Sequence, residues 1–181
     1  SRNVLVATSE ARNTPLAWPG SAGTLMVMLN ASAPLCKYSI NFRGFLILLN
    51  SSTRSRGFFY EDELTQLTGD WADAFDLQSS ADDEITAAVI LNQKLYISTR
   101  YKLFRVTFVG GNPDWSVLEV KDWGFVPRTA RRIPLKDIGE VVVGMSWDRK
   151  IRLFDGSDDK IISDNVENTN LCDFSMDGIS F

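Results

Sequence analysis

The chain has 181 residues, of which 44% are hydrophobic and 23% are charged, a globular composition that excludes an intrinsically disordered protein. Lys and Arg total 19 against 23 Asp and Glu, and this formal net charge of −4 argues against nucleic acid as the main partner. No apolar run approaches the roughly 20 residues of a membrane helix. We expect one domain over residues 1–181 with a sizeable core and no membrane span.

The first third of the chain contains β-prone runs separated by turn residues. These runs cover residues 3–8, 24–29, 35–40, 44–49 and 57–60. Pro15, Pro19 and two glycines mark a loop between the first two runs. Residues 44–49 are apolar on both faces, which predicts an interior strand.

Residues 61–78 change character. Trp71, Ala74, Phe75 and Gln78 stand at helical spacing behind Asp70, a good N-cap residue, so a short helix is one interpretation. The interpretation that we favour is an irregular loop that places Trp71 in the core. Residues 79–84 predict an acidic surface loop.

The β pattern returns at residue 85. Strands are predicted over residues 85–91, 94–98, 102–108 and 115–120, and, after a connection at 121–137, over 140–145, 150–154 and 160–162. Within 150–154, Ile151 and Leu153 alternate with Arg152 and Phe154, the period of a strand with two different faces. A last strand pair is expected within residues 171–181.

A repeat runs through these strands. Residues 94–108 align with 140–154 as strand, polar turn and strand, and residues 44–60 give a fainter third copy. The offset from Lys102 to Lys150 matches the period of about 40–50 residues of propeller blades. The sequence therefore predicts an all-β, propeller-like array of short antiparallel meanders. The alternative is a β-sandwich, such as a capsid-type jelly roll, because short strands with polar turns also fit that architecture.

Four blades of ordinary size would use the whole chain. We therefore expect a small closed toroid, a homo-oligomer, or a part of a larger parent chain. The first residue is Ser1 rather than Met, which indicates a processed, tagged or excised chain.

The sequence carries little catalytic chemistry. It contains no histidine, which removes Ser–His and Cys–His nucleophilic pairs and histidine-ligated zinc. No phosphate-binding glycine loop is present, and the acidic turn at 155–159 lacks the spacing of a calcium-binding EF-hand. Four carboxylates that might do acid–base work show no paired spacing: Asp62, Glu63, Glu84 and Glu119. We expect no enzyme activity, no cofactor and no metal site.

Two cysteines and two sequons bear on the compartment. Cys36 and Cys172 either form one disulfide or are two buried thiols. Asn30-Ala31-Ser32 and Asn50-Ser51-Ser52 are acceptor patterns for N-glycosylation. Together these features favour a secreted, extracellular glycoprotein, with a cytoplasmic protein as the alternative.

Residues 146–155, Ser-Trp-Asp-Arg-Lys-Ile-Arg-Leu-Phe-Asp, resemble the closing hairpin of a WD repeat, with Phe154 in place of its final Trp. Residues 174–178 resemble the start of a following repeat, although the usual Gly-His dipeptide between them is missing. This resemblance implies a propeller that serves as a protein–protein interaction scaffold.

Another part of the chain resembles a second family of propellers, the fungal fucose-binding lectins. The order of strands and turns in a blade of that family is followed by residues 86–89, 94–98, 102–108 and 114–115. In that family a strand Arg and a strand Glu hold sugar hydroxyls while an aromatic ring stacks on the sugar. In this chain Arg152 occupies the position of the sugar-binding Arg in one copy of the repeat. In the other two copies the equivalent position is occupied by Tyr96 and Leu46. Ser163, Arg105 and Tyr60 stand where Glu is expected. The resemblance implies a lectin-like fold and ligand class, not fucose itself.

We therefore expect a non-enzymatic module that binds carbohydrate by aromatic stacking and polar hydrogen bonds. The ligand-binding candidates are Arg152, Trp147, Trp115, Tyr96 and Arg105. For Trp71 and Trp115, core packing is the plainer interpretation. A scaffold that binds a protein surface is the alternative function, and a structural capsid-type protein is the next.

Overall fold

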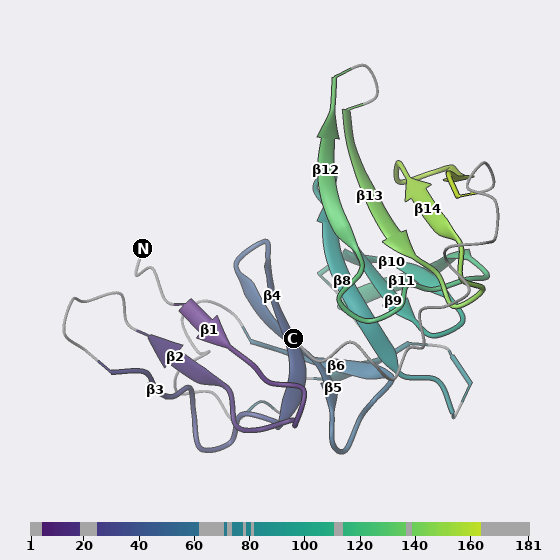
Figure 1. Cartoon of the computed structure of the whole chain (residues 1–181). Helices are drawn as coiled ribbons and strands as arrows, with labels where there is room; N and C mark the ends of the chain where they lie inside the picture. The colour runs from purple at the N-terminus through teal and green to yellow at the C-terminus, as the bar shows by residue number, and fades with distance from the viewer. Residues whose placement is uncertain are drawn as a thin grey trace.

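The computed structural model describes residues 5–18, 25–61, 71, 74–77, 79–80, 82–110, 114–136 and 139–163. Every regular element within these ranges is a β-strand (Figure 1). In chain order the strands are β1 (Leu5–Ala7), β2 (Leu16–Trp18), β3 (Val27–Met28), β4 (Cys36–Phe42), β5 (Phe45–Ser51), β6 (Gly57–Glu61), β7 (Ala74–Asp76), β8 (Ile85–Leu91), β9 (Lys94–Thr99), β10 (Leu103–Phe108), β11 (Trp115–Lys121), β12 (Arg131–Leu135), β13 (Gly139–Met145), β14 (Ile151–Phe154) and β15 (Asp159–Ile161).

The strands form four antiparallel sheets in which each strand pairs only with its neighbours in the chain. The first sheet is β1-β2-β3, the second β4-β5-β6-β7, the third β8-β9-β10-β11 and the fourth β12-β13-β14-β15. Short turns permit this order because antiparallel neighbours need no long crossover. The prediction of an all-β fold built from short antiparallel meanders is confirmed.

The second sheet is buried on both faces because β5 carries large apolar side chains in both directions. Leu46 and Leu48 pack toward the first sheet, together with Trp71. Ile47 and Leu49 point the other way, into the layer shared with the third sheet. All four aliphatic side chains are at most 4% exposed. The predicted interior strand is confirmed.

The third sheet is likewise covered on both faces. Ile97 and Val106 belong to the layer shared with the second sheet. Tyr96 and Leu103 pack instead against Phe154 of the fourth sheet. The sheets therefore stack on one another in chain order, from the purple first sheet to the green fourth sheet in Figure 1. β8 lies beside both β4 and β12, the first strands of the adjoining sheets.

Trp115 is the centre of the layer between the second and third sheets. The indole is 1% exposed, and its ring centroid lies 5.1–5.6 Å from those of Phe45, Phe58, Tyr60 and Phe108. All four contacts are edge-to-face, a favourable geometry for aromatic rings. Trp115 is thus a core residue, as its plainer interpretation predicted, and not the ligand-binding residue for which it was also a candidate.

Three segments differ from expectation. The segment predicted as a loop around Pro15 and Pro19 contains the short strand β2, which pairs with both β1 and β3. The helical interpretation of residues 71–78 is wrong, because β7 pairs with β6; Trp71 is 2% exposed, as the favoured loop interpretation predicted. The connection at 121–137 contains a strand, β12. The sequence did not predict this strand because it carries charged residues and Pro134. β12 is an edge strand, where proline is tolerated. The strand pair expected within 171–181 lies outside the described residues.

We predict that Trp115→Ala lowers the free energy of unfolding by about 3–5 kcal/mol, the usual cost of truncating a large buried aromatic. Urea unfolding followed by circular dichroism measures the loss. Leu118→Ala on the same strand is the control, because Leu118 is 51% exposed and its truncation should cost no more than about 0.5 kcal/mol. Equal losses for the two variants would contradict this account of the core.

Candidate functional site

Three corresponding turns bring polar residues to one end of the sheets. Each turn joins the second and third strands of a four-stranded sheet: β5 to β6, β9 to β10 and β13 to β14. Ser52, Arg100 and Trp147, one from each turn, line a common pocket. The repeat detected in the sequence therefore corresponds to three equivalent hairpins that meet in space.

A hydroxyl group at the end of each second strand stabilises these turns. Ser51 Oγ accepts a hydrogen bond from the Arg54 amide at 2.9 Å, and Thr99 Oγ1 accepts one from the Lys102 amide at 3.1 Å. The one hydroxyl hydrogen of Ser146 is shared between the Lys150 carbonyl, 3.0 Å from Oγ, and the Asp148 carboxylate. Serine and threonine suit these positions because their short side chains bond to the local backbone of a turn.

Described residues line two adjoining pockets at this end. The larger one has a volume of about 570 Å³ and lies between the third and fourth sheets. Its wall combines three kinds of side chain. They are the aromatic rings of Tyr101, Trp123 and Trp147, the carboxylates of Asp122, Asp148 and Asp159, and the cations of Arg100, Lys121 and Arg152.

Arg152 is fixed on several sides within this wall, and its side chain is 12% exposed. Its Nε donates to Ser146 Oγ at 2.9 Å. Its Nη1 and Nη2 donate to Asp159 at 2.8 Å and to Asp148 at 2.6 Å. The guanidinium also lies over the Trp123 ring, 4.8 Å from its centroid. Arg152 therefore holds the wall together, with most of its hydrogen-bonding capacity already used.

The two carboxylates beside Arg152 are held in the ionised state. Burial alone would raise the pKa of Asp148, but hydrogen bonds from Ser146 and Arg152 and the Arg152 charge outweigh it and lower the pKa. For Asp159, burial is likewise outweighed by hydrogen bonds and charge from Lys121 and Arg152, so its pKa is lowered. Both groups are hydrogen-bond acceptors at neutral pH.

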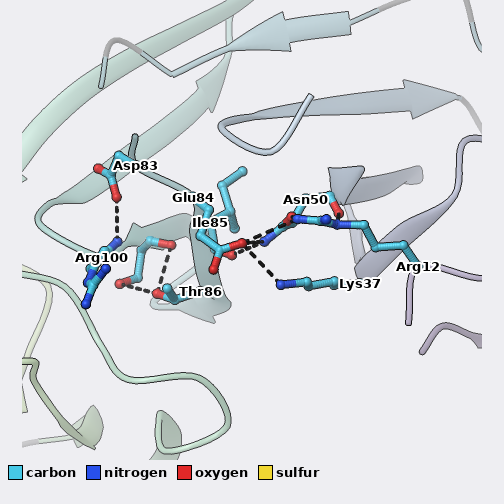
Figure 2. Close-up of polar contacts among 9 residues, drawn as sticks. Arg12, Lys37, Asn50, Asp83, Glu84, Ile85, Thr86 and Arg100 are labelled. Atoms are coloured by element: carbon cyan, nitrogen blue, oxygen red, sulfur yellow. Dashed lines mark hydrogen bonds and ion pairs between the residues drawn. The ribbon is translucent and has the colours of Figure 1, made fainter. Parts of the chain in front are cut away.

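Arg100 differs from the other cations of the pocket. Its guanidinium lies 4.5 Å from the centroid of the Trp147 ring and 5.6 Å from that of Tyr101. Within the described part of the chain it forms no ion pair. Its backbone amide is anchored, since it donates to Asp83 Oδ1 at 2.8 Å (Figure 2).

A second pocket of about 350 Å³ adjoins the first and shares Arg100 and Trp147 with it. Figure 2 shows the polar network at this pocket, in which Arg12, Lys37 and Asn50 converge on Glu84. Burial alone would raise the pKa of Glu84, but the Asn50 amide, the Lys37 ammonium and the Arg12 charge outweigh it and lower the pKa.

The structure separates the five predicted ligand-binding residues. Arg152 and Trp147 line the larger pocket, whereas Trp115, Tyr96 and Arg105 line neither pocket. Tyr96 is 1% exposed, and its hydroxyl donates to the Gly156 carbonyl at 2.9 Å. Its ring packs edge-on against Phe154. The prediction of Tyr96 as a ligand-binding residue is therefore corrected, because the ring fills the layer between the third and fourth sheets.

The sequence did not reveal several residues of the site. Arg100, Trp123, Asp148 and Asp159 all line the larger pocket, whereas Tyr101, which also lines it, was already a candidate exposed aromatic residue. Arg100 follows Thr99 in the β9–β10 turn, as Trp147 follows Ser146 in the β13–β14 turn. The repeat alignment therefore held a signal for Arg100. No sequence signal paired Trp123 with Arg152, because that contact depends on the path of the connection between two sheets.

The structure also bears on the sequons and cysteines. Asn50 is fully buried, and its Nδ2 donates both to Glu84 at 3.1 Å and to the Ile85 carbonyl at 2.6 Å. This folded arrangement leaves no room for a glycan on Asn50, whereas Asn30, in the loop after β3, stays a predicted acceptor. Cys36 is buried, and burial raises the pKa of its thiol to about 12. Cys172 lies outside the described residues.

We compared the chain with protein-family models and with curated proteins. No protein-family model matches the chain, and no curated protein matches it. The described ranges contain no cluster of three or more Asp, Glu, Cys or His side chains able to hold a metal ion. The same ranges contain no helix of the length and hydrophobicity needed to cross a membrane.

We predict that Asp159→Asn lowers the free energy of unfolding at neutral pH by roughly 1–3 kcal/mol, because Arg152 and Lys121 each lose a charged acceptor. Since folding lowers the pKa of Asp159, its contribution exists above the unfolded value of 3.8 and disappears as pH falls through the folded value. The difference between wild type and variant should therefore shrink below that pH.

Urea unfolding at neutral pH and at steps down to about pH 2 measures both effects. Asp158→Asn is the matched control, because Asp158 is exposed in the same turn and its side chain lines neither pocket. A pH-independent deficit for Asp159→Asn, or an equal deficit for Asp158→Asn, would contradict the assigned role of the ion pairs.

Proposed function

We propose that the three four-stranded sheets are consecutive blades of a propeller-like array. Their first strands begin at Cys36, Ile85 and Arg131, spacings of 49 and 46 residues. These values are close to the usual length of a propeller blade. The sequential strand order, the contact of β8 with both β4 and β12, and the face-to-face stacking of the sheets support this arrangement over a jelly roll, whose Greek-key connections join non-adjacent strands.

Within this array we propose a non-enzymatic carbohydrate-binding pocket between the third and fourth sheets. The observation that carries the proposal is the composition of the wall, in which Tyr101, Trp123 and Trp147 stand among aspartates and arginines. Ligand sites of this size combine apolar ring surface with a few placed polar groups. Sugars offer the matching chemistry, because each ring presents apolar C–H faces and hydroxyl groups that both donate and accept.

Two of the three carboxylates in the wall of the larger pocket suit binding better than acid catalysis. A glycoside hydrolase needs one carboxyl group that holds a proton near neutral pH and can pass it to the leaving group. Asp148 and Asp159 have lowered pKa values, so both accept hydrogen bonds and neither retains a proton at that pH. Ionised aspartates of this kind serve as acceptors for sugar hydroxyls.

We predict that Trp147→Ala weakens the binding of a sugar in this pocket roughly tenfold or more, equivalent to about 1.4 kcal/mol. The indole is the aromatic side chain that lines both pockets, so its removal takes away stacking surface at their junction. A glycan array identifies the ligand, and isothermal titration with that sugar measures the loss.

Val109→Ala is the matched control, because Val109 is 56% exposed and lines neither pocket. Its affinity should equal that of the wild type. A wild-type protein that binds no sugar on the array and none in titrations at millimolar concentration would overturn the carbohydrate proposal and favour the protein-interaction scaffold expected as the alternative.

A further inference from the structure

The two pockets meet at one pair of side chains. Arg100 and Trp147 line both pockets, and the Arg100 guanidinium lies over the Trp147 ring at 4.5 Å. Each pocket separately falls within the range of about 300–1,000 Å³ that is usual for small-ligand sites. A ligand longer than one pocket therefore continues into the next by passing this pair.

Among the described residues, Arg100 is the cation at this junction that forms no ion pair. Of the four cations that line the pockets, Arg12 pairs with Glu84, Lys121 with Asp159, and Arg152 with both Asp148 and Asp159. Arg100 has only ring contacts among the described side chains. Its exposed guanidinium can therefore adjust to a ligand and donate hydrogen bonds without breaking an ion pair.

The wall of the smaller pocket holds a carboxylate with an unfilled hydrogen-bonding requirement. Asp83 is 1% exposed, and Oδ1 accepts the Arg100 amide, but Oδ2 has no partner in the described part of the chain (Figure 2). Trp147 Nε1, at the junction, is likewise a buried donor with no partner within the same ranges. Buried polar atoms nearly always have a hydrogen-bond partner, and three other buried atoms in the described residues also lack one: Trp71 Nε1, Ser79 Oγ and Trp115 Nε1. Asp83 and Trp147 differ from these because their side chains line the pockets, where a ligand can supply a donor and an acceptor.

The charge of the combined wall selects among ligands. Among the described side chains that line the two pockets, six carboxylates outnumber four cations, which gives a net charge of −2. Such a wall repels an acidic sugar, because like charges brought together in a partly buried site weaken binding. The same carboxylates attract hydroxyl groups, which donate hydrogen bonds to them. A neutral ligand rich in hydroxyl groups fits this balance.

We infer that the two pockets are subsites of one binding groove for a neutral oligosaccharide, which crosses the Arg100–Trp147 pair and donates a hydroxyl group to Asp83. This inference rests on the carbohydrate-binding function proposed above and specifies its ligand. One sugar unit occupies the larger pocket, a neighbouring unit occupies the smaller pocket, and Arg100 contacts both.

Titration with neutral oligosaccharides of one to four units tests the inference. The probes are cello-, malto-, manno- and N-acetylchito-oligosaccharides, with oligogalacturonides of the same lengths as acidic counterparts. In the series that binds, we expect affinity to rise about tenfold or more between one unit and three, because the second subsite adds contacts. The acidic series should bind more weakly at each length.

Two matched variants locate the second subsite. Ser52→Phe places a ring in the smaller pocket from an exposed turn position, whereas Thr53→Phe adds the same ring to the neighbouring exposed position, which lines neither pocket. Ser52→Phe should remove the gain from chain length and leave the binding of one unit unchanged. Thr53→Phe should change neither. Asp83→Asn, which keeps the side-chain shape, should reduce the gain as well.

The outcomes separate the inference from the proposed function. A protein that binds single sugars, shows no gain with length and is unaffected by Ser52→Phe keeps its carbohydrate-binding function and loses the second subsite. Tighter binding of the acidic series would overturn the preference for a neutral ligand. A protein that binds none of the probes at any length would overturn the proposed function and this inference together.

Discussion

The geometry of the site depends on how each sheet is joined to the next. At the end of β5, the buried Asn50 amide donates to the Ile85 carbonyl at the start of β8. At the end of β9, the buried Ser98 Oγ accepts a hydrogen bond at 2.7 Å from the Phe125 amide in the connection to the fourth sheet. A buried backbone group without a hydrogen-bond partner costs free energy. These two bonds therefore fix the position of each connection relative to the preceding sheet. A side chain on Gly124 would collide with the Thr99 carbonyl, which makes the connection to the fourth sheet tight.

This junction carries the functional residues with it. Trp123 precedes Gly124, so anchoring the connection presses the Trp123 ring against Arg152 and forms one wall of the larger pocket. The other junction places Asp83 and Glu84 next to the β9–β10 turn and the second sheet in the same way. Both pockets are thus products of sheet-to-sheet connections, and their aromatic and charged groups come from segments that are far apart in the chain.

The parts of the fold that depend on local pattern could be predicted from the sequence, and the parts that depend on sheet stacking could not. Alternation and turn residues located most strands, including β5 and β14, because strand period and turn chemistry are encoded within a few residues. β12 was missed because an edge strand exposes its charged residues. β2 and β7 were missed because three residues are too few to show a period. Trp115 and Tyr96 resembled ligand-binding aromatics, yet burial between two sheets decides their role.

Arg152 shows why the residue could be found while its role could not. The sequence placed it at the position of a sugar-binding arginine, and the structure does place it in the wall of a pocket. Its donors, however, are directed to Ser146, Asp148 and Asp159, so it orders the carboxylates that face the pocket. Among the described cations that line the pockets, the one without an ion pair is Arg100, one sheet away. The repeated architecture explains why the available cation is Arg100 and not Arg152. Equivalent turns bring several candidate side chains to the same pocket, and the ion pairs that form there determine which of them remains available.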